Sequence, residues 1–443
     1  MKSTWLERWE PESPEFWLGK GRTIAWQTLT ITTIALVLSF ATWFVMSAVV
    51  VRLPRIGFKY DTMQLFWLAA IPGLAGGTLR IVHTFLVPLF GTRRVVTIAT
   101  LLKLIPCVGI GLAVMNPETP FWVFLLLAFS AGFGGGDFSS FMPSTSLFFP
   151  KRLQGTALGI QAGIGNFGVS LTQFVTPWII GFAALGALAG DPQTFTAGEV
   201  SKPIWVQNAT FWYVPVLLFV ALLAWVFLRS VPIRASVKEQ MDIFRDKHTW
   251  LMTSLYIMTF GSFSGLSAVF PLLIMSLYGD FPNAPDPLRY AYLGPLIGSA
   301  IRVIGGPLSD RFGGGILTQI SGFGLVACAL AIAPFLDPSS LQEFPRFVAL
   351  MLGLFFFAGL GNASTFRQIP IIFAHSPRQA GGVLGWTAAV AAYGPFVFAS
   401  LVGLTITSLG SPKFFFYGAA VFYAVNLWIN WWYYYRRGAE RPC

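Results

Sequence analysis

Two arginines, Arg80 and Arg302, lie inside long apolar stretches of the sequence, where a charged side chain needs a chemical reason. A charge at the centre of a bilayer costs roughly 2.5–3.5 kcal/mol even on a lenient insertion scale. Each guanidinium group can donate two parallel hydrogen bonds to one small planar oxyanion. The alternative is structural, with each arginine bound to a carboxylate or to a helix C-terminus. We favour an anion site, because carboxylates are nearly absent from these stretches.

Charge balance supports the same interpretation. Of the 18 acidic residues only Asp137 falls well inside an apolar stretch, and Asp310 lies at a helix end. One carboxylate cannot neutralise four buried cations, so a negative substrate would complete the balance. The four basic residues inside these stretches are Arg80, Lys103, Arg302 and Arg367. Lys103 and Arg367 either line an entry path or bind carbonyl groups at helix ends.

Asp137 is the main candidate for a proton carrier, because protonation of a buried carboxyl group responds to nearby charge. The alternative is a permanent ion pair with one of the four basic residues. His83 also titrates near neutral pH, although a hydrogen-bonded packing role is the simpler interpretation.

Glycines interrupt two of the apolar stretches, at Gly163, Gly165 and Gly168 and again at Gly385. The first group matches G-x-G-x-x-G, but no strand precedes it, so a dinucleotide site is not expected. Small residues here let helices approach closely, slide or bend, which indicates gating. Asn166, within this run, is either a hydrogen-bond donor to the substrate or a contact between helices. The turn around Asp310 and Arg311 is a second candidate gate.

The elements that carry these residues are long apolar helices. The 443-residue chain is 55% hydrophobic and only 11% charged, with a mean hydropathy of +0.67. This composition excludes a disordered protein, a disulfide scaffold and almost any ordinary soluble enzyme. Helices long enough to cross a bilayer are expected at about 24–51, 62–90, 93–115, 119–149, 153–183, 207–229, 248–278, 288–311, 314–335, 345–374, 379–408 and 412–435.

The sequence therefore predicts an all-α polytopic membrane protein with about twelve transmembrane helices in two pseudo-symmetric six-helix halves. Arg80, followed by Phe90-Gly91, has its echo 222 residues later in Arg302, followed by Phe312-Gly313. Such a repeat is typical of transporters that bind substrate between two halves. The expected segments are 1–23, 24–229, 230–247, 248–435 and 436–443, of which the first, third and last are cytoplasmic.

Basic residues outside the apolar stretches set the orientation. With the N-terminus in the cytoplasm, 18 lysines and arginines lie on that side and seven on the other. Both termini are then cytoplasmic, and much of the net charge of +11 reflects topology rather than a nucleic-acid surface. The sequence contains no nucleophile–base arrangement, Walker loop or metal cluster, so we expect no enzyme, no cofactor and no nucleic-acid partner. No obligate protein partner can be read from it.

Several motifs resemble the NarK-type nitrate/nitrite porters of the major facilitator superfamily. The resemblance covers nearly the whole chain and rests on TLRIVHTFLVPLFGTRR, LFFPKRLQGTALGIQAGIGNFGVS, AIRVIGGPLSDRFGG and GLGNASTFRQIPIIF. It implies the major facilitator fold, alternating access and a nitrate or nitrite ion held between Arg80 and Arg302. It further implies substrate contacts from Asn166 and Tyr256, and from three aromatic rings that enclose the anion, Phe40, Phe138 and Phe260.

The chain also departs from that family. The exchanger branch usually has asparagine at Asp137 and an uncharged residue at Arg367, and the signature GVLGWTAAVAAYG is a loose match. The extra titratable charge favours nitrate/proton symport across a bacterial inner membrane. Nitrate/nitrite exchange, or nitrite export, is the alternative. A facilitator for a small organic anion is a more distant one.

Overall fold

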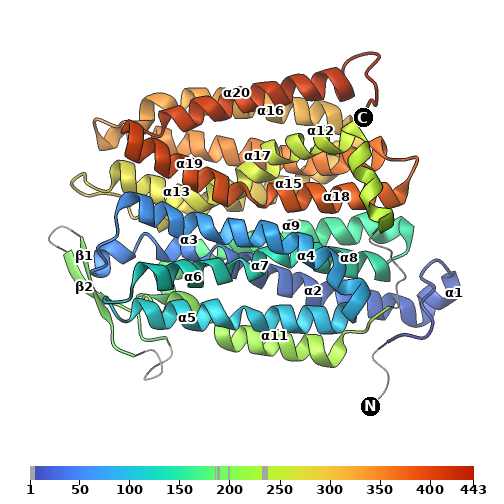
Figure 1. Cartoon of the computed structure of the whole chain (residues 1–443), viewed down its shortest axis with the longest axis horizontal. Helices are drawn as coiled ribbons and strands as arrows, with labels where there is room; N and C mark the ends of the chain where they lie inside the picture. The colour runs from blue at the N-terminus through green and yellow to red at the C-terminus, as the bar shows by residue number, and fades with distance from the viewer. Residues whose placement is uncertain (1–4, 185, 187–189, 198–199, 232–237) are drawn as a thin grey trace.

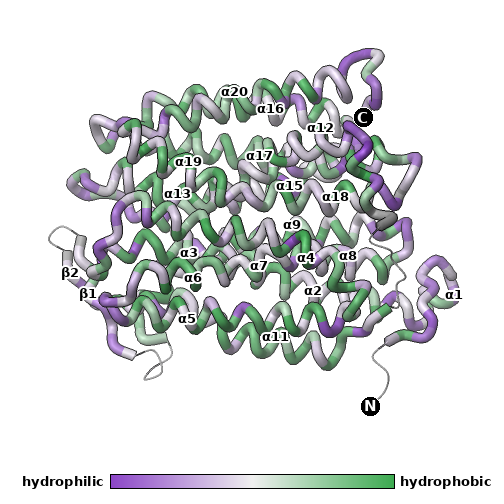
Figure 2. Tube along the Cα trace, in the orientation of Figure 1, coloured by the Kyte–Doolittle hydropathy of each residue, from purple (hydrophilic) through white to green (hydrophobic). Residues whose placement is uncertain are grey.

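The structure, a computed structural model, describes residues 5–184, 186, 190–197, 200–231 and 238–443. It is a bundle of long helices lying side by side, with a short β-hairpin at one end (Figure 1). Hydrophobic residues follow the helices, and hydrophilic residues gather toward the two ends of the bundle (Figure 2). By length and composition, eight helices in the described residues could cross a membrane. The expected all-α polytopic membrane fold is confirmed.

The first part of the chain forms six rods, whose helices join at single-residue breaks. The first rod begins at Pro14, earlier than expected, because the Ser13 hydroxyl accepts a hydrogen bond from the Phe16 N–H and caps it. The elements are α1 (Pro14–Phe16), the π-helix η1 (Trp17–Gly21), α2 (Arg22–Trp43) and α3 (Val45–Val49); α4 (Thr62–Leu102), bent into two rods, the second completed by α5 (Leu104–Val114); α6 (Phe121–Ala131), α7 (Phe133–Gly136) and α8 (Phe138–Phe148); α9 (Lys151–Ile179); and α10 (Asn208–Phe211) with α11 (Tyr213–Phe227).

The second part of the chain forms six further rods after the 3-10 helix η4 (Lys238–Arg245). Part of the expected linker, residues 232–237, lies outside the described residues, and the division into halves by residue number stays a prediction. The elements are α12 (Lys247–Tyr256), the π-helix η5 (Ile257–Gly261) and α13 (Ser262–Tyr278); α14 (Leu288–Ala291) and α15 (Leu293–Phe312); α16 (Gly314–Ala331); α17 (Phe344–Ile372); α18 (Pro377–Ala391) and α19 (Gly394–Leu409); and α20 (Lys413–Asn430) with the π-helix η8 (Trp431–Tyr435).

Gly91 and Gly313 make the same turn in the two halves. Gly91 bends α4 with a φ of 76°, and Gly313 separates α15 from α16 with a φ of 92°. Both values lie in a region that glycine adopts readily and other residues rarely do. A Cβ atom at Gly91 would also come within 2.5 Å of the Ser230 hydroxyl oxygen. The internal repeat read from these two glycines is therefore visible in the backbone.

A β-hairpin, which the sequence analysis did not predict, lies at one end of the bundle beside the first half (Figure 1). Strands β1 (Gln193–Ala197) and β2 (Val200–Ile204) pair antiparallel, with Gln193 opposite Ile204. The ring of Phe195, in β1, has its centre 5.6 Å from the guanidinium carbon of Arg52. Five-residue strands inside a long connection give too short a pattern to distinguish from a loop.

At this same end an ion pair joins the two halves. Arg52 Nη2 lies 2.8 Å from each carboxylate oxygen of Asp286, just before α14. Arg55 donates a hydrogen bond of 3.3 Å to the Gly279 carbonyl. Deeper in the bundle α4 packs against α19, and α9 against α15. The Arg52–Asp286 bridge therefore closes the hairpin end of the interface between the halves.

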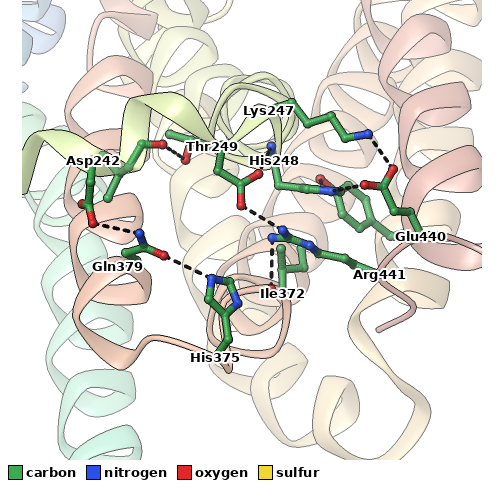
Figure 3. Close-up of polar contacts among 12 residues, drawn as sticks. Asp242, Lys247, His248, Thr249, Ile372, His375, Gln379, Glu440 and Arg441 are labelled. Atoms are coloured by element: carbon green, nitrogen blue, oxygen red, sulfur yellow. Dashed lines mark hydrogen bonds and ion pairs between the residues drawn. The ribbon is translucent and has the colours of Figure 1, made fainter.

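At the opposite end the C-terminal tail folds back onto the second half (Figure 3). Arg441 pairs with Asp246 at 2.9 Å and donates to the Ile372 carbonyl at 3.2 Å. Glu440 lies 2.7 Å from Lys247 Nζ and 3.1 Å from His248 Nε2. The tail, residues 436–443, thus fastens the start of α12 to the end of α17.

Candidate functional site

Arg80, on α4, is fully buried and joins elements of both halves. Its Nε donates to the Gly135 carbonyl at 2.8 Å, and its Nη1 donates to the Ala388 carbonyl of α18 at 2.6 Å. Its Nη2 has no hydrogen-bond partner. The guanidinium group is therefore held by two backbone carbonyls, with one nitrogen left free to bind a ligand.

Arg302, on α15, is 6% exposed and is held more loosely. Its Nη2 donates a long hydrogen bond of 3.4 Å to the Tyr256 hydroxyl, and its Nη1 has no partner. The same Tyr256 ring stacks on Phe260 with 5.5 Å between ring centres. Arg302 therefore also keeps an unoccupied donor.

The ring of Phe260 lies close to both arginines. Its centre is 5.2 Å from the guanidinium carbon of Arg80 and 5.9 Å from that of Arg302. The structure thus brings together two residues 222 positions apart, one from each half. Among the described residues neither arginine has a carboxylate within ion-pairing distance. Two unpaired cations around one aromatic ring form a site suited to a small anion.

Of the other two predicted aromatic residues, one lies beside Arg80 and the other lies farther away. The centre of the Phe138 ring lies 4.8 Å from the guanidinium carbon of Arg80. Phe40 is one step removed, because its ring contacts Phe138 at 6.3 Å. Phe138 and Phe40 therefore lie on the N-terminal half's side of Arg80, and Phe260, from the C-terminal half, lies against the same guanidinium group.

Asn166, on α9, is fully buried, and neither its amide nitrogen nor its amide oxygen has a hydrogen-bond partner. Gln173, seven residues later on the same helix face, bonds Ser47 at 3.0 Å and the Ser267 carbonyl at 2.9 Å, one from each half. Asn166 thus faces the interface between the halves, with its polar atoms still unbonded.

Asp137 is buried in an ion pair with Lys103, so its charge is already matched. The Ser39 hydroxyl donates to the same carboxylate oxygen at 2.6 Å, and Lys103 Nζ also donates to the Ala99 carbonyl at 2.9 Å. The expectation that Lys103 binds a backbone carbonyl was correct but incomplete. This pair contributes no net charge to the anion site.

His83 lies beside that pair. Its Nδ1 is 2.9 Å from the Ser140 hydroxyl and 3.7 Å from Asp137 Oδ1. Asp137 Oδ1 has no hydrogen-bond partner. The hydrogen bond to Ser140 fits the packing role expected as the simpler interpretation, and proton coupling by His83, which lies within reach of the one free oxygen of the carboxylate, stays a prediction.

Arg367 is not a buried cation. It lies five residues before α17 ends at Ile372, and 40% of its side chain is exposed. Its guanidinium group pairs with Asp310. The expectation that it binds carbonyl groups was wrong, because the α15 carboxylate lies within reach of its guanidinium group. With Lys103 also paired, the four cations counted from sequence reduce to two unpaired ones, Arg80 and Arg302.

The predicted gating residues lie at separate places in the structure. A Cβ atom at Gly163 would lie 2.6 Å from Val303 of α15, and one at Gly165 would lie 2.7 Å from Leu36 of α2. Gly385 has open space beside it. Asp310 pairs within its own half, and Arg311 lies over Phe312 at 5.3 Å. Gating by these residues stays a prediction.

Two aromatic residues near the arginines were missed. The Trp43 ring centre lies 5.4 Å from the guanidinium carbon of Arg80, and that of Phe366 lies 5.6 Å from that of Arg302. Trp43 follows Phe40 by three residues on one helix, which was a usable signal. The Gly135 and Ala388 carbonyls, by contrast, carry no side-chain signal.

Comparison with known proteins extends this picture. The Major Facilitator Superfamily model matches residues 31–366. A probable nitrate/nitrite antiporter NarK2 of Thermus thermophilus is 65% identical over 443 residues, covering 100% of this chain and 99% of that protein. The nitrate/nitrite transporter NarU of Escherichia coli K12 is 38% identical, covering 98% and 96%.

Two solved structures show the same fold. A bacterial homolog of the human lysosomal transporter Spinster, inward-facing and occupied, has a TM-score of 0.66 at 16% identity, covering 91% of this chain and 95% of that one. A D-xylose–proton symporter has a TM-score of 0.65 at 15% identity, covering 92% and 97%. At this identity the likeness concerns the fold alone.

Proposed function

Because the chain belongs to the NarK-type nitrate/nitrite porters of the major facilitator superfamily, we propose that it moves nitrate and nitrite across a membrane through one site between Arg80 and Arg302. It is a transporter and not an enzyme. The observation that carries the proposal is the pair of buried, carboxylate-free guanidinium groups close to the ring of Phe260. In this mechanism the anion bonds both free nitrogens and draws the halves together, and the site then opens on the other side.

The charge of the site favours exchange of one anion for another. An empty site leaves two guanidinium groups close together in a low-dielectric interior with no counter-charge between them. A return step that carries a second anion avoids that arrangement. Because Lys103 already neutralises Asp137, this carboxylate is not available to replace the anion on the way back. The 65% identity to a probable nitrate/nitrite antiporter supports the same coupling.

Proton symport, which the sequence alone favoured, is the second candidate. The observation in its favour is the unbonded Oδ1 of Asp137, 3.7 Å from His83 Nδ1. In that mechanism a proton taken up by one of these groups weakens the Lys103 pair during each cycle.

We place the protein in a bacterial inner membrane with both termini in the cytoplasm. The distribution of basic residues supports this orientation. Figure 1 adds that α1 and the C-terminus lie at the same end of the bundle. The Arg52–Asp286 bridge would then close the outer side.

Nitrate uptake into proteoliposomes with an internal pH dye tests these proposals, with and without trapped nitrite. Exchange predicts uptake that needs internal nitrite and leaves internal pH unchanged. Symport predicts uptake without trapped anion and with internal acidification, abolished in Asp137→Asn. Liposomes carrying Arg80→Ala, Arg302→Ala protein are the control. Absence of nitrate flux under both conditions, or stronger competition by formate or lactate than by nitrite, would overturn the nitrate/nitrite assignment.

A further inference from the structure

A second buried asparagine, Asn362 of α17, is left with unbonded polar atoms. It is fully buried, and neither its amide nitrogen nor its amide oxygen has a hydrogen-bond partner. Buried amides are ordinarily bonded, because leaving one without a partner costs stability. This residue is not among those predicted from the sequence or implied by the family resemblance. A bound ligand that hydrogen-bonds the Asn362 amide would remove this cost.

Its neighbours on α17 define the direction of its side chain. Thr365, three residues later, lies with its hydroxyl 3.2 Å from that of Thr259 in η5. Phe366, four residues later, has its ring centre 5.6 Å from both the Tyr256 ring centre and the Arg302 guanidinium carbon. Residues three and four positions apart share a helix face, so Asn362 points between these two directions. Thr259, Tyr256 and Arg302, which contact these two residues, therefore flank that sector.

Contacts between α17 and α15 define its depth. A Cβ atom at Gly359 would lie 2.3 Å from the Gly298 carbonyl oxygen, and one at Gly305 would lie 2.9 Å from the Ala363 side chain. Arg302 lies between Gly298 and Gly305 along α15, and Asn362 lies between Gly359 and Ala363 along α17. The two side chains are therefore at the same level in the bundle.

We infer that Asn362 is a specificity-determining residue that donates a hydrogen bond to an oxygen of bound nitrate, as the C-terminal counterpart of Asn166. This inference rests on the proposed function. Arg80 and Arg302 each offer one free nitrogen, enough for the two oxygens of nitrite. Nitrate has a third oxygen that can accept further hydrogen bonds, and the unbonded amide nitrogens of Asn166 and Asn362, one from each half, can donate them. A site built to hydrogen-bond one group discriminates against the analogue that lacks it.

The test compares anion affinities of the full-length protein in proteoliposomes. Asn362→Ala is expected to raise the KM for nitrate by about 10-fold or more, since a hydrogen bond to a charged group is lost. The KM for nitrite should change by less than about 3-fold, so the nitrate-to-nitrite preference falls. Asn426→Ala is the matched control, because Asn426 is equally buried in α20 and also has an unbonded amide oxygen. It should leave the preference unchanged.

Three results would overturn the inference. The first is an Asn362→Ala variant with both KM values unchanged, and the second is equal weakening of nitrate and nitrite. The third applies if Asn362→Ala does not fold: Asn362→Leu keeps the size of the side chain but removes the donor, and a wild-type anion preference with a lowered melting temperature in that variant would indicate a structural amide. Failure of the wild-type protein to carry nitrate would instead refute the proposed function.

Discussion

At the scale of single residues, Arg80 combines two tasks that lysine cannot combine. Two of its nitrogens hold the Gly135 and Ala388 carbonyls, and the third is free. A lysine keeps the charge, but its single nitrogen on a flexible stem cannot bind two fixed carbonyls and an anion together. Arg302 donates one long hydrogen bond to Tyr256, so its guanidinium group is less constrained than that of Arg80.

Arg80→Lys is therefore expected to raise the KM for nitrate by about 10- to 100-fold, equivalent to about 1.5–3 kcal/mol of a charge-assisted hydrogen bond. Arg302→Lys should have the smaller effect of the two. Exchange kinetics in proteoliposomes measure both. Arg94→Lys, which is exposed and lies on α4 beyond Gly91, is the control and should match wild type. A wild-type KM in Arg80→Lys would show that its charge alone is needed.

At the scale of elements, the Arg52–Asp286 bridge connects the segment after α3 with the start of α14. Arg52 is largely buried, with 7% of its side chain exposed, against 31% for Asp286. An ion pair with one largely buried partner is screened less by solvent than a surface pair. Its formation therefore favours the conformation in which the hairpin end of the bundle is closed.

Arg52→Gln is expected to shift the protein toward conformations open at the hairpin end. Spin labels at Glu118 and Gln342, one in each half at that end, would report a longer and broader distance distribution in a cysteine-free background. Arg55→Gln is the matched control, since within the described residues Arg55 makes one weak hydrogen bond to a backbone carbonyl and no ion pair. The exchanged pair Arg52→Asp, Asp286→Arg should recover part of the closed population. Identical distributions in wild type and Arg52→Gln would contradict the role.

The elements also show what the sequence can predict. Apolar runs of about 20 residues and the echo of Arg80 in Arg302 were sufficient for the helices and the site's two charges, because both depend on residue type and spacing. An ion pair between Asp137 and one of the four basic residues was an expected alternative, but the sequence could not select Lys103, because three-dimensional packing decides which of several cations reaches one carboxylate. The orientation of Asn362 depends on the rotation of α17, and the ends of the apolar runs do not fix that rotation.

At the scale of the whole molecule, the C-terminal tail depends on acidic side chains. Hydrogen bonds from Lys247 and then His248 lower the pKa of Glu440 below its usual value. Asp242, in η4, accepts a hydrogen bond from Arg378 of α18, and this bond lowers the pKa of Asp242 in the same way. A carboxyl group with a lowered pKa stabilises the folded arrangement above its usual pKa, and this contribution is lost as the pH falls through the lower, folded value.

The tail is therefore expected to stay bound from pH 7 to pH 5 and to detach only below about pH 4.5. Hydrogen exchange of the Arg441 and Cys443 amides, which donate to the Tyr433 and Tyr434 carbonyls, measures this directly. Glu440→Gln should weaken their protection at pH 7, while the amides of α20 remain protected. Loss of protection in wild type already at pH 6 would point to His248 instead of the carboxylates.

The β-hairpin gives this helical bundle a distinct folded epitope that most of its surface lacks. Figure 1 shows it at the end of the bundle away from the C-terminus, and Phe195 ties it to Arg52. An antibody fragment that recognised the hairpin in this position would bind an epitope that contacts the Arg52–Asp286 bridge between the halves. Such a binder would hold the carrier in one conformation without touching the anion, and so would inhibit it non-competitively.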